Sequence, residues 1–239
     1  MIKLYRTIAF DMKKDFSGFT LLEIVVAVMI FGIIMLTAFS AFRSFAVSSD
    51  MIRNNMAASQ VSAGITRTMT RDFLSLRIAL EPEYSRPVSG GRTDDKDRFR
   101  FVGDETAGKT DTFSRVRFAS LAHIYSGSSK RAGAARVIYY VRPDNQGRFD
   151  LCRSDTLNRF DETDGNECDP VICKDVTMFK VSYTDTDAQE HSYWDSESDE
   201  HGYATPVSVS IYMEFMAGSS IHKFSTTFAM PLFRPPAQI

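Results

Sequence analysis

The chain is poor in the residues from which small catalytic and metal sites are usually built. In 239 residues it has three cysteines, one tryptophan and four histidines, the last at His123, His191, His201 and His222. None of the histidines lies in a nucleophile motif such as Gly-x-Ser-x-Gly or at metal-binding spacing from another. We therefore expect no catalytic site, no metal site and no cofactor, and we predict that the protein is not an enzyme.

A strong net charge is also lacking. The formal net charge is −2, whereas a nucleic-acid-binding domain normally carries a basic stripe. We therefore expect no nucleic-acid partner. Gly90 and Gly91 are followed by charged residues and not by Gly-Lys-Ser/Thr, so this pair indicates a flexible connection and not a phosphate-binding loop.

The three cysteines are Cys152, Cys168 and Cys173. In an oxidising compartment an odd count suggests one disulfide and one remaining thiol. Cys168 with Cys173, which would close a tight loop, is one candidate pair; Cys152 with either of them is another, and three thiols is the third arrangement. A zinc site would need a fourth ligand, and no histidine lies near these three in sequence.

Two acidic segments, 161–167 and 195–200, offer many oxygen atoms. The first also has a glycine turn at Gly165, but it lacks the Asp-x-Asp-x-Asp-Gly spacing that arranges side chains around one calcium ion. We expect both segments to be solvated loops, and calcium binding by the first stays open.

A long apolar run lies near the N-terminus. From Phe19 to Phe42 there is no Lys, Arg or Asp, and Glu23 is the single ionisable residue. As a helix this run would reach about 36 Å, enough to cross a hydrocarbon core of about 30 Å. A carboxylate there is costly, by about 2.5–3.5 kcal/mol at mid-membrane and less near the surface. We therefore predict a transmembrane helix in which Glu23 needs a positive partner, and an α-amine created at Phe19 would lie one helical turn away.

The charges flanking the span predict its orientation. Four basic residues precede it, Lys3, Arg6, Lys13 and Lys14, and only Arg43 and Arg53 follow closely. The positive-inside rule then places the leader in the cytoplasm and the rest across the membrane. A secretory signal cut near Ala38 is the first competing interpretation, although its apolar region would be unusually long; an uncleaved signal anchor is the second.

Helical periodicity continues beyond Phe42. From Arg43 to Leu80 there is no proline and one glycine, Gly64, and Pro82 is expected to end the helix. Apolar residues form one stripe, at Val61, Ile65, Met69, Phe73, Leu76 and Leu80. The opposite face, with the adjacent Arg71 and Asp72 and with Arg77, is expected to be solvated.

After residue 82 the apolar period changes from 3.6 to 2. Candidate strands are 99–102, 115–118, 136–142, 148–153, 176–183, 207–215 and 224–230, with a turn at 143–147. Their one-sided alternation is typical of antiparallel sheets. We predict an α+β fold, in which a long N-terminal helix, transmembrane and then amphipathic, packs on an antiparallel β-sheet domain.

The short basic leader, the sequence Gly18-Phe19-Thr20-Leu21-Leu22-Glu23 and the unbroken apolar helix resemble the type III signal of the type IV pilin and pseudopilin superfamily. The resemblance implies that prepilin peptidase cuts between Gly18 and Phe19 and N-methylates Phe19, and that Glu23 is the assembly carboxylate. Ser17 departs from the pattern, in which a basic residue precedes the glycine. The implied organisation is a cleaved leader (1–18), a transmembrane helix (19–42), its amphipathic continuation (43–82) and an extracytoplasmic β-rich domain (83–239).

The outer domain is similar to that of the minor pseudopilin J family of the type II secretion system. Four segments carry this resemblance: 70–77 with Arg71-Asp72; 137–140 with Leu151-Cys152-Arg153; 175–183 with Trp194; and Pro206-Val207-Ser208-Val209. The loop between Asp155 and Asp169 and the cysteines are not part of that pattern.

The resemblance implies a structural component of the pseudopilus, at its tip, needed for assembly and for export of folded proteins across the outer membrane. Its implied place is the bacterial inner membrane, single pass, with the C-terminal domain in the periplasm. The implied partners are other minor pseudopilins, the major pseudopilin, prepilin peptidase, the inner-membrane assembly platform and a secreted substrate. The alternatives are a minor type IV pilin or competence pseudopilin, acting in adhesion or DNA uptake, and a membrane-tethered binding module or hydrolase.

Overall fold

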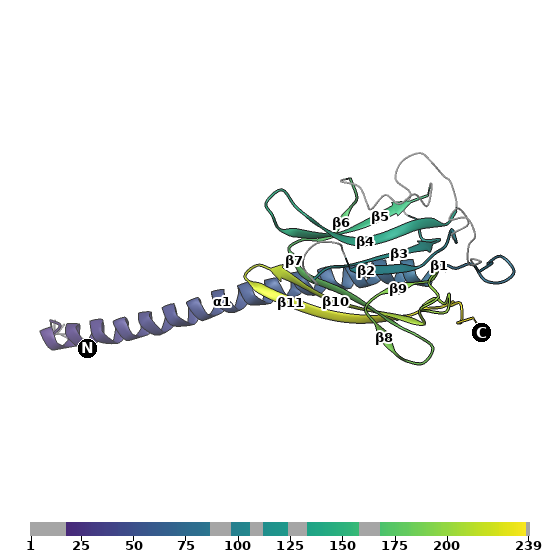
Figure 1. Cartoon of the computed structure of the whole chain (residues 1–239). Coiled ribbons are helices and arrows are strands. Elements are labelled where there is room, and N and C mark those ends of the chain that lie inside the picture. Colours follow the sequence, from purple (N-terminus) through teal and green to yellow (C-terminus); the bar gives the residue numbers. More distant parts are fainter. Residues whose placement is uncertain (1–17, 87–96, 106–111, 124–132, 158–167, 238–239) are drawn as a thin grey trace, which may run out of the picture. The chain divides into compact units, whose positions relative to one another are not determined.

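The computed structural model describes residues 18–86, 97–105, 112–123, 133–157 and 168–237. The chain divides into two compact units, Met1–Ile52 and Arg53–Ile239, and each is treated by itself below. One helix, α1 (Leu21–Leu74), begins in the first unit and ends in the second, and antiparallel sheets follow it (Figure 1). The predicted α+β class is confirmed.

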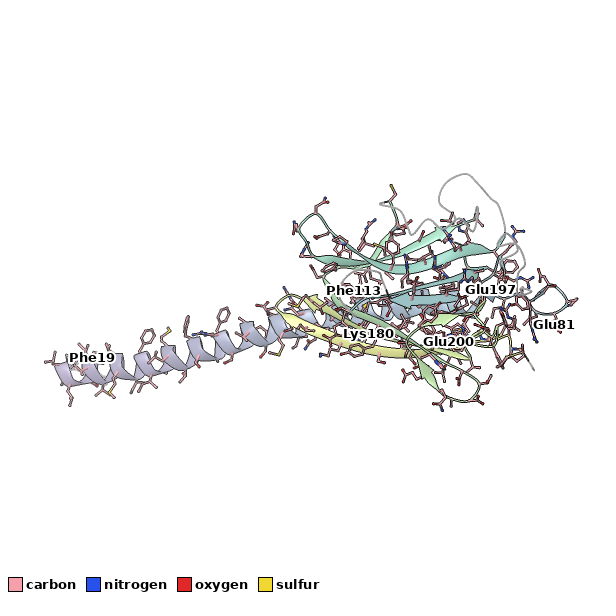
Figure 2. The ribbon with its side chains drawn as sticks, viewed as in Figure 1. Phe19, Glu81, Phe113, Lys180, Glu197 and Glu200 are labelled. Atoms are coloured by element: carbon pink, nitrogen blue, oxygen red, sulfur yellow. The ribbon has the colours of Figure 1, made fainter. Side chains whose placement is uncertain are left out.

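In the first unit the apolar side chains of α1 are exposed. Their exposed fractions run from 46% at Val26 to 81% at Leu21, and Phe19 just before the helix exposes 79%. Side chains project from this part of the helix in Figure 2. Among the described residues α1 is the helix that is long and apolar enough to cross a membrane. Leaving such a run in water would be unfavourable by about 25 cal/mol per Å², so it needs lipid or protein around it.

In the second unit the remainder of α1 contributes one face to the core. Ala58, Ile65, Met69 and Phe73 are buried, at helical spacing. Val61, which the sequence placed on the same stripe, is 37% exposed. The buried stripe is therefore narrower than predicted, and α1 uses one side to hold the sheets.

The helix ends at Leu74, earlier than the predicted Leu80. Leu76 and Arg77 form a short strand, β1 (Leu76–Arg77), which pairs with β3 (Ser114–Ser120). Ser120 Oγ donates to the carbonyl of Asp72 at 2.9 Å, and Leu121 N donates to that of Ser75 at 2.8 Å. Ser120, the last residue of β3, and Leu121 thus satisfy carbonyls that a longer helix would have used internally, so α1 stops before Pro82.

Within the described residues the first sheet has seven strands, in the order β6-β5-β4-β3-β2-β9 with β1 beside β3. Every pair is antiparallel. The strands are β2 (Val102–Glu105), β3 (Ser114–Ser120), β4 (Ala135–Pro143), β5 (Phe149–Thr156), β6 (Val171–Cys173) and β9 (Trp194–Asp195). The predicted turn joins β4 to β5, where Gly147 adopts a φ of 76° that favours glycine.

The second sheet, in the part of the chain that the structure describes, has four strands in the order β11-β10-β7-β8. They are β7 (Val176–Thr184), β8 (Glu190–His191), β10 (Ser208–Ala217) and β11 (Ser220–Ala229). Val209, Ile211, Met213 and Phe215 are buried, as their strict alternation predicted. One face of this sheet therefore belongs to the core.

Phe73 of α1 joins the helix to both sheets. Its ring stacks on Phe118 of β3 with centroids 4.6 Å apart and on Phe228 of β11 at 5.0 Å. The two sheets also meet directly, since Tyr183 of β7 packs edge-on against Phe101 at 5.8 Å. A Cβ at Gly103 of β2 would lie 1.8 Å from the Tyr183 hydroxyl oxygen, so the close approach of Tyr183 to this strand requires glycine at position 103.

Candidate assembly site

The backbone around Gly18 and Phe19 is non-helical, and both residues are exposed. Helix α1 begins at Leu21, so the bond between Gly18 and Phe19 precedes the first helical turn. Exposed backbone outside regular secondary structure is where proteolytic cleavage concentrates. The geometry at this bond therefore suits the predicted cleavage.

Glu23 lies in the first turn of α1 and closes a capping box with Thr20. Glu23 N donates to Thr20 Oγ1 at 3.3 Å, and Thr20 N donates in return to Glu23 Oε2 at 3.4 Å. The two residues thus satisfy two amides that have no partner inside the helix, and the negative carboxylate sits at the positive end of the helix dipole. Glu23 has a local partner in the uncut chain, and an incoming amine would compete with Thr20 for it.

The sequence interpretation missed this role of Thr20. The signal for it is Thr-x-x-Glu before an apolar run, which is the standard capping-box pattern. It was visible in the same six residues that carry the pilin-like resemblance.

At its other end α1 is anchored by a buried ion pair. Asp72 is fully buried, and Arg153 of β5 contacts it twice, Nε to Oδ2 at 2.6 Å and Nη2 to Oδ1 at 3.0 Å. Tyr139 of β4 donates its hydroxyl to Asp72 Oδ2 at 2.5 Å. The Asp72 carboxylate thereby ties the helix to two neighbouring strands.

The same cluster shifts two pKa values. Burial, the Asp72 charge and its hydrogen bond raise the pKa of Tyr139 well above its ordinary value. Burial opposes the charge on Arg153, but its hydrogen bonds to Asp72 and Asp155 outweigh it and raise the pKa of Arg153. Both groups keep their usual protonation states at neutral pH, which the anchor requires.

This anchor corrects the expectation for Arg71 and Asp72. Arg71 is half exposed, as expected for a solvated helix face, and its Nε lies 3.8 Å from Asp72 Oδ1. Asp72 itself faces the core, contrary to the expectation. Two of the four segments that suggested the pseudopilin J family meet here: 70–77, with Asp72, and 137–140 with Leu151-Cys152-Arg153.

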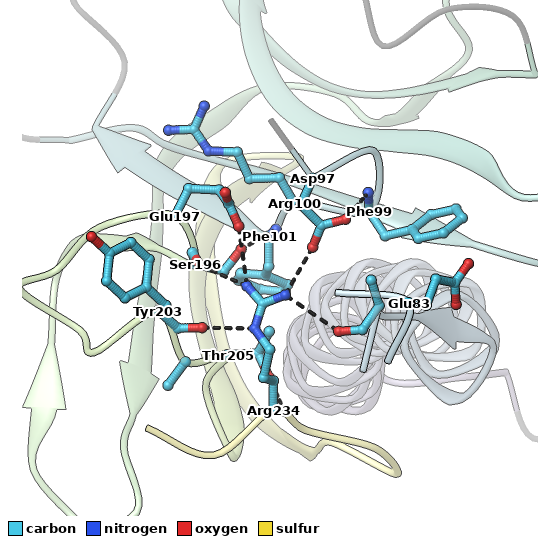
Figure 3. A network of polar contacts seen from close by, with 12 residues as sticks. Glu83, Asp97, Phe99, Arg100, Phe101, Ser196, Glu197, Tyr203, Thr205 and Arg234 are labelled. Carbon is cyan, nitrogen blue, oxygen red and sulfur yellow. Dashed lines mark hydrogen bonds and ion pairs between the residues drawn. The ribbon is translucent and has the colours of Figure 1, made fainter. Parts of the chain in front are cut away.

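A second polar centre surrounds Arg234 (Figure 3). Its guanidinium donates to carbonyl oxygens of Tyr203 at 2.7 Å and Ser196 at 2.6 Å, and it pairs with Asp97 at 2.9 Å and Glu197 at 3.2 Å. It also lies 3.5 Å from the centroid of the Tyr84 ring. Arg234 thus joins three chain segments that are far apart in sequence. No local sequence pattern predicts this role.

This centre also corrects the expectation for the acidic segment 195–200. Asp195 is buried and makes a two-pronged ion pair with Arg100, and Glu197 faces Arg234. Burial raises the pKa of Glu197, since it disfavours the charged form. The other acidic segment, 161–167, and the glycine pair at 90–91 lie outside the described residues.

The cysteines occupy different environments. Cys173 of β6 is a buried thiol in the main core, and Cys152 of β5 is a buried thiol in a separate cluster with Ile138 and Tyr140. Cys173 is buried in the core and Cys168 is exposed, and no bond joins their sulfur atoms in the structure. Cys152 and Cys173 are not bonded to each other either, and they lie in different hydrophobic clusters. Burial raises the pKa of Cys152 to about 11 and that of Cys173 to about 12, so both are thiols at neutral pH.

Residues 13–39 match the family described as the prokaryotic N-terminal methylation motif. The match covers Gly18, Phe19 and Glu23, and it supports the type IV pilin-like class for this chain. No curated protein matches the chain. The motif suggests processing by a prepilin peptidase and assembly with other pilin-like subunits.

Proposed function

We propose that this chain is a minor pseudopilin of a type II secretion system, a structural subunit of the pseudopilus at or near its tip. The observation that carries the proposal is an exposed apolar helix whose first turn holds Glu23, in a capping box with Thr20, inside the match to the methylation motif. The tie between the helix end and the first sheet through Asp72, in segments that resemble pseudopilin J, favours this subunit over others. The role is mechanical and not catalytic.

In the proposed mechanism the leader holds the precursor in the inner membrane with the outer domain in the periplasm. Prepilin peptidase cuts before Phe19 and methylates its amine, which remains positive. Glu23 then exchanges its contact with Thr20 for a subunit's N-terminal amine, which offsets the cost of the carboxylate in an apolar setting. The helix can then leave lipid and pack among other pilin-like helices, while the outer domain contacts other minor pseudopilins, the assembly platform and the secreted substrate.

The experiment replaces Glu23 by Gln in the full-length chain and measures secretion and pseudopilus formation. Gln retains a hydrogen-bond acceptor for Thr20 and loses the charge, so Glu23→Gln should abolish assembly while the protein remains in the membrane. Glu81→Gln, an exposed acid outside α1, is the matched control and should be silent. If the Glu23→Gln variant secretes normally, the proposed assembly role of Glu23 is wrong and the helix serves only as a membrane tether.

Mass spectrometry of the mature N-terminus tests the processing step separately. We expect a chain that begins with N-methylated Phe19, and a chain that retains Met1 would contradict the proposal. Crosslinking of the outer domain in the envelope then distinguishes a secretion pseudopilus from an adhesive or DNA-uptake pilus, by the identity of the neighbours.

A further inference from the structure

In the second unit, the side of α1 that does not enter the core carries its own regular stripe. Its members follow one another at alternating spacings of three and four residues, and all of them are exposed: Ala57, Gln60, Gly64, Arg67, Arg71 and Leu74. We call these six residues the outer stripe. A repeat that averages 3.5 residues is the spacing at which one helix packs along another.

A shallow groove of about 680 Å³ runs beside the outer stripe. Arg67, Arg71 and Leu74 line it, and Leu74 is an apolar residue that is 63% exposed. The groove follows the helix from Ala63 to Ser75, about 18 Å at 1.5 Å per residue. Its length along α1 suits an elongated element such as a second helix.

The exposed charge of α1 in the second unit is of one sign. The charged residues on it are Arg53, Arg67, Arg71 and Asp72, and the single acid, Asp72, is buried. Among the described residues neither Arg53 nor Arg67 forms an ion pair. Arg71 lies 3.8 Å from Asp72, but Arg153 already binds that carboxylate twice. The chain thus leaves positive charge on this face, and an element that covers it needs acidic side chains.

Gly64 indicates how closely this element approaches. Glycine inside a helix lowers the stability of the helix relative to alanine. Apart from the neighbouring helix backbone, no atom of the described chain lies within 4 Å of the place that a Cβ at Gly64 would take. The fold of this chain therefore does not require glycine there, whereas a helix that crosses the outer stripe at close range does.

A second copy of this chain does not match the charge of the outer stripe. Helices that leave one membrane from their N-terminal ends run parallel, so a symmetric pair would place Arg67 opposite Arg67 and Arg71 opposite Arg71. Like charges at facing positions oppose association. The helix that covers the outer stripe therefore comes from a different subunit.

We propose that the outer stripe is the docking site for a parallel helix of a different pilin-like subunit. Acidic side chains of that helix pair with Arg67 and Arg71, and the two helices approach most closely at Gly64. This inference rests on the proposed function, because it takes the partner from the same assembly. It adds the face of α1 that the partner uses and the charge that the partner carries.

Photocrosslinking of the full-length chain in the cell envelope tests the contact. A benzophenone amino acid replaces Gln60, and in the matched control it replaces Ser59, an exposed helix residue outside the outer stripe. We expect at least about tenfold more adduct from position 60, because that position alone faces the partner helix. Mass spectrometry should identify the partner as another protein with an N-methylated N-terminus, crosslinked at a peptide that contains Asp or Glu. Equal yields, an adduct with a second copy, or an adduct with a protein that lacks this N-terminus would each overturn the proposal.

Charge reversal tests the chemistry of the contact. Arg67→Glu should reduce the adduct from position 60 by at least about tenfold, since like charges then face each other. Replacing the acid at the crosslinked site of the partner by Lys should restore it. Lys180→Glu, which reverses an exposed charge on β7, is the matched control and should leave the yield unchanged. A yield that Arg67→Glu does not alter, or that the partner's Lys does not restore, would refute the charge pairing.

Gly64→Ala distinguishes a docking surface from a solvated helix face. Because alanine favours the helix, this variant should raise the midpoint of thermal unfolding of the full-length protein in detergent. It should also lower the adduct yield at position 60, and Gly64→Leu should abolish it. Full yield in both variants would overturn the close approach. Cleavage before Phe19 and loss of assembly in Glu23→Gln, together with no adduct at position 60, would overturn this docking site and leave the proposed function standing.

Discussion

Two tyrosine hydroxyls in the core differ in whether they have a partner. Tyr139 donates to Asp72, whereas the hydroxyl of Tyr183 is buried and has no hydrogen-bond partner among the described residues. Burial raises the pKa of Tyr183 well above its ordinary value, so the group stays protonated and carries an unsatisfied donor. Such a group costs stability, while a satisfied one contributes it.

We therefore expect opposite effects from the same chemical change at these two positions. Tyr183→Phe should raise the free energy of unfolding by about 1 kcal/mol, and Tyr139→Phe should lower it by about 1.5–3 kcal/mol. Denaturant unfolding followed by fluorescence of the single tryptophan, Trp194, measures both, since its ring lies 6.3 Å from that of Tyr183. Equal losses of unfolding free energy in the two variants would contradict the conclusion that the Tyr139 hydroxyl is hydrogen-bonded and that of Tyr183 is not.

His201 makes stability depend on pH. Its ring stacks on Trp194 at 4.2 Å, and burial, with His191 nearby, lowers its pKa below 6.5; Glu200, Asp195 and Asp185 act in the opposite direction. Because the unfolded chain takes up the proton first, stability is full above pH 6.5 and falls as pH drops from there to the folded-state pKa. Unfolding curves between pH 8 and pH 5, roughly, should show this loss. His201→Phe should flatten the loss, and an unchanged slope would assign it to other groups.

At the scale of elements, the tie between α1 and the sheet depends on the Asp72–Arg153 pair. Removing one member of a buried ion pair leaves the other charge uncompensated, so Arg153→Met should destabilise the second unit by about 3–5 kcal/mol. Arg71→Met is the matched control, because Arg71 is half exposed and 3.8 Å from Asp72, and should change stability by less than about 0.5 kcal/mol. Thermal unfolding compares the two variants, and similar losses would refute the anchor.

The elements that could be predicted from the sequence are those whose signal is local and long. The alternation of Val209, Ile211 and Met213 placed β10, and the apolar run from Phe19 placed α1. Strands β1, β6, β8 and β9 were missed, since two or three residues carry no period and each depends on a partner strand. The end of α1 was predicted too far along the chain. The hydroxyl of Ser120, distant in sequence, donates a hydrogen bond to the Asp72 carbonyl and so satisfies the end of the helix.

The residues of the candidate site also fall into those that a local sequence pattern predicts and those that depend on distant partners. Gly18, Phe19 and Glu23 are contiguous, so a motif describes them, and the capping partner Thr20 was within reach of the same pattern. Asp72 and Arg153 are 81 positions apart, and Arg234 meets Asp97 across 137 positions. Without a fold, each of these charges is indistinguishable from a solvated surface residue, because its partners come from distant parts of the chain.

At the scale of the whole molecule, exposure changes along α1. No residue from Gly18 to Ala57 is buried, and buried core side chains begin at Ala58. The two polar centres that hold the second unit, around Asp72 and Arg234, involve only residues after Ala58. The unit that begins at Arg53 therefore contains its own core and its own tertiary bonds.

We accordingly expect a chain of residues 53–239 to fold without the first 52 residues. It should be soluble without detergent, and its Trp194 emission and unfolding midpoint should match those of the full-length protein in detergent, because no core side chain has been removed. A fragment that also lacks 53–66 is the control: it loses Ala58 and Ile65 from the core, and truncations of this kind cost about 2–5 kcal/mol for each large side chain, so it should unfold or aggregate. If the 53–239 fragment itself aggregated, the first part of α1 would have to support the core, and the division of the helix between an assembly segment and a folded domain would be wrong.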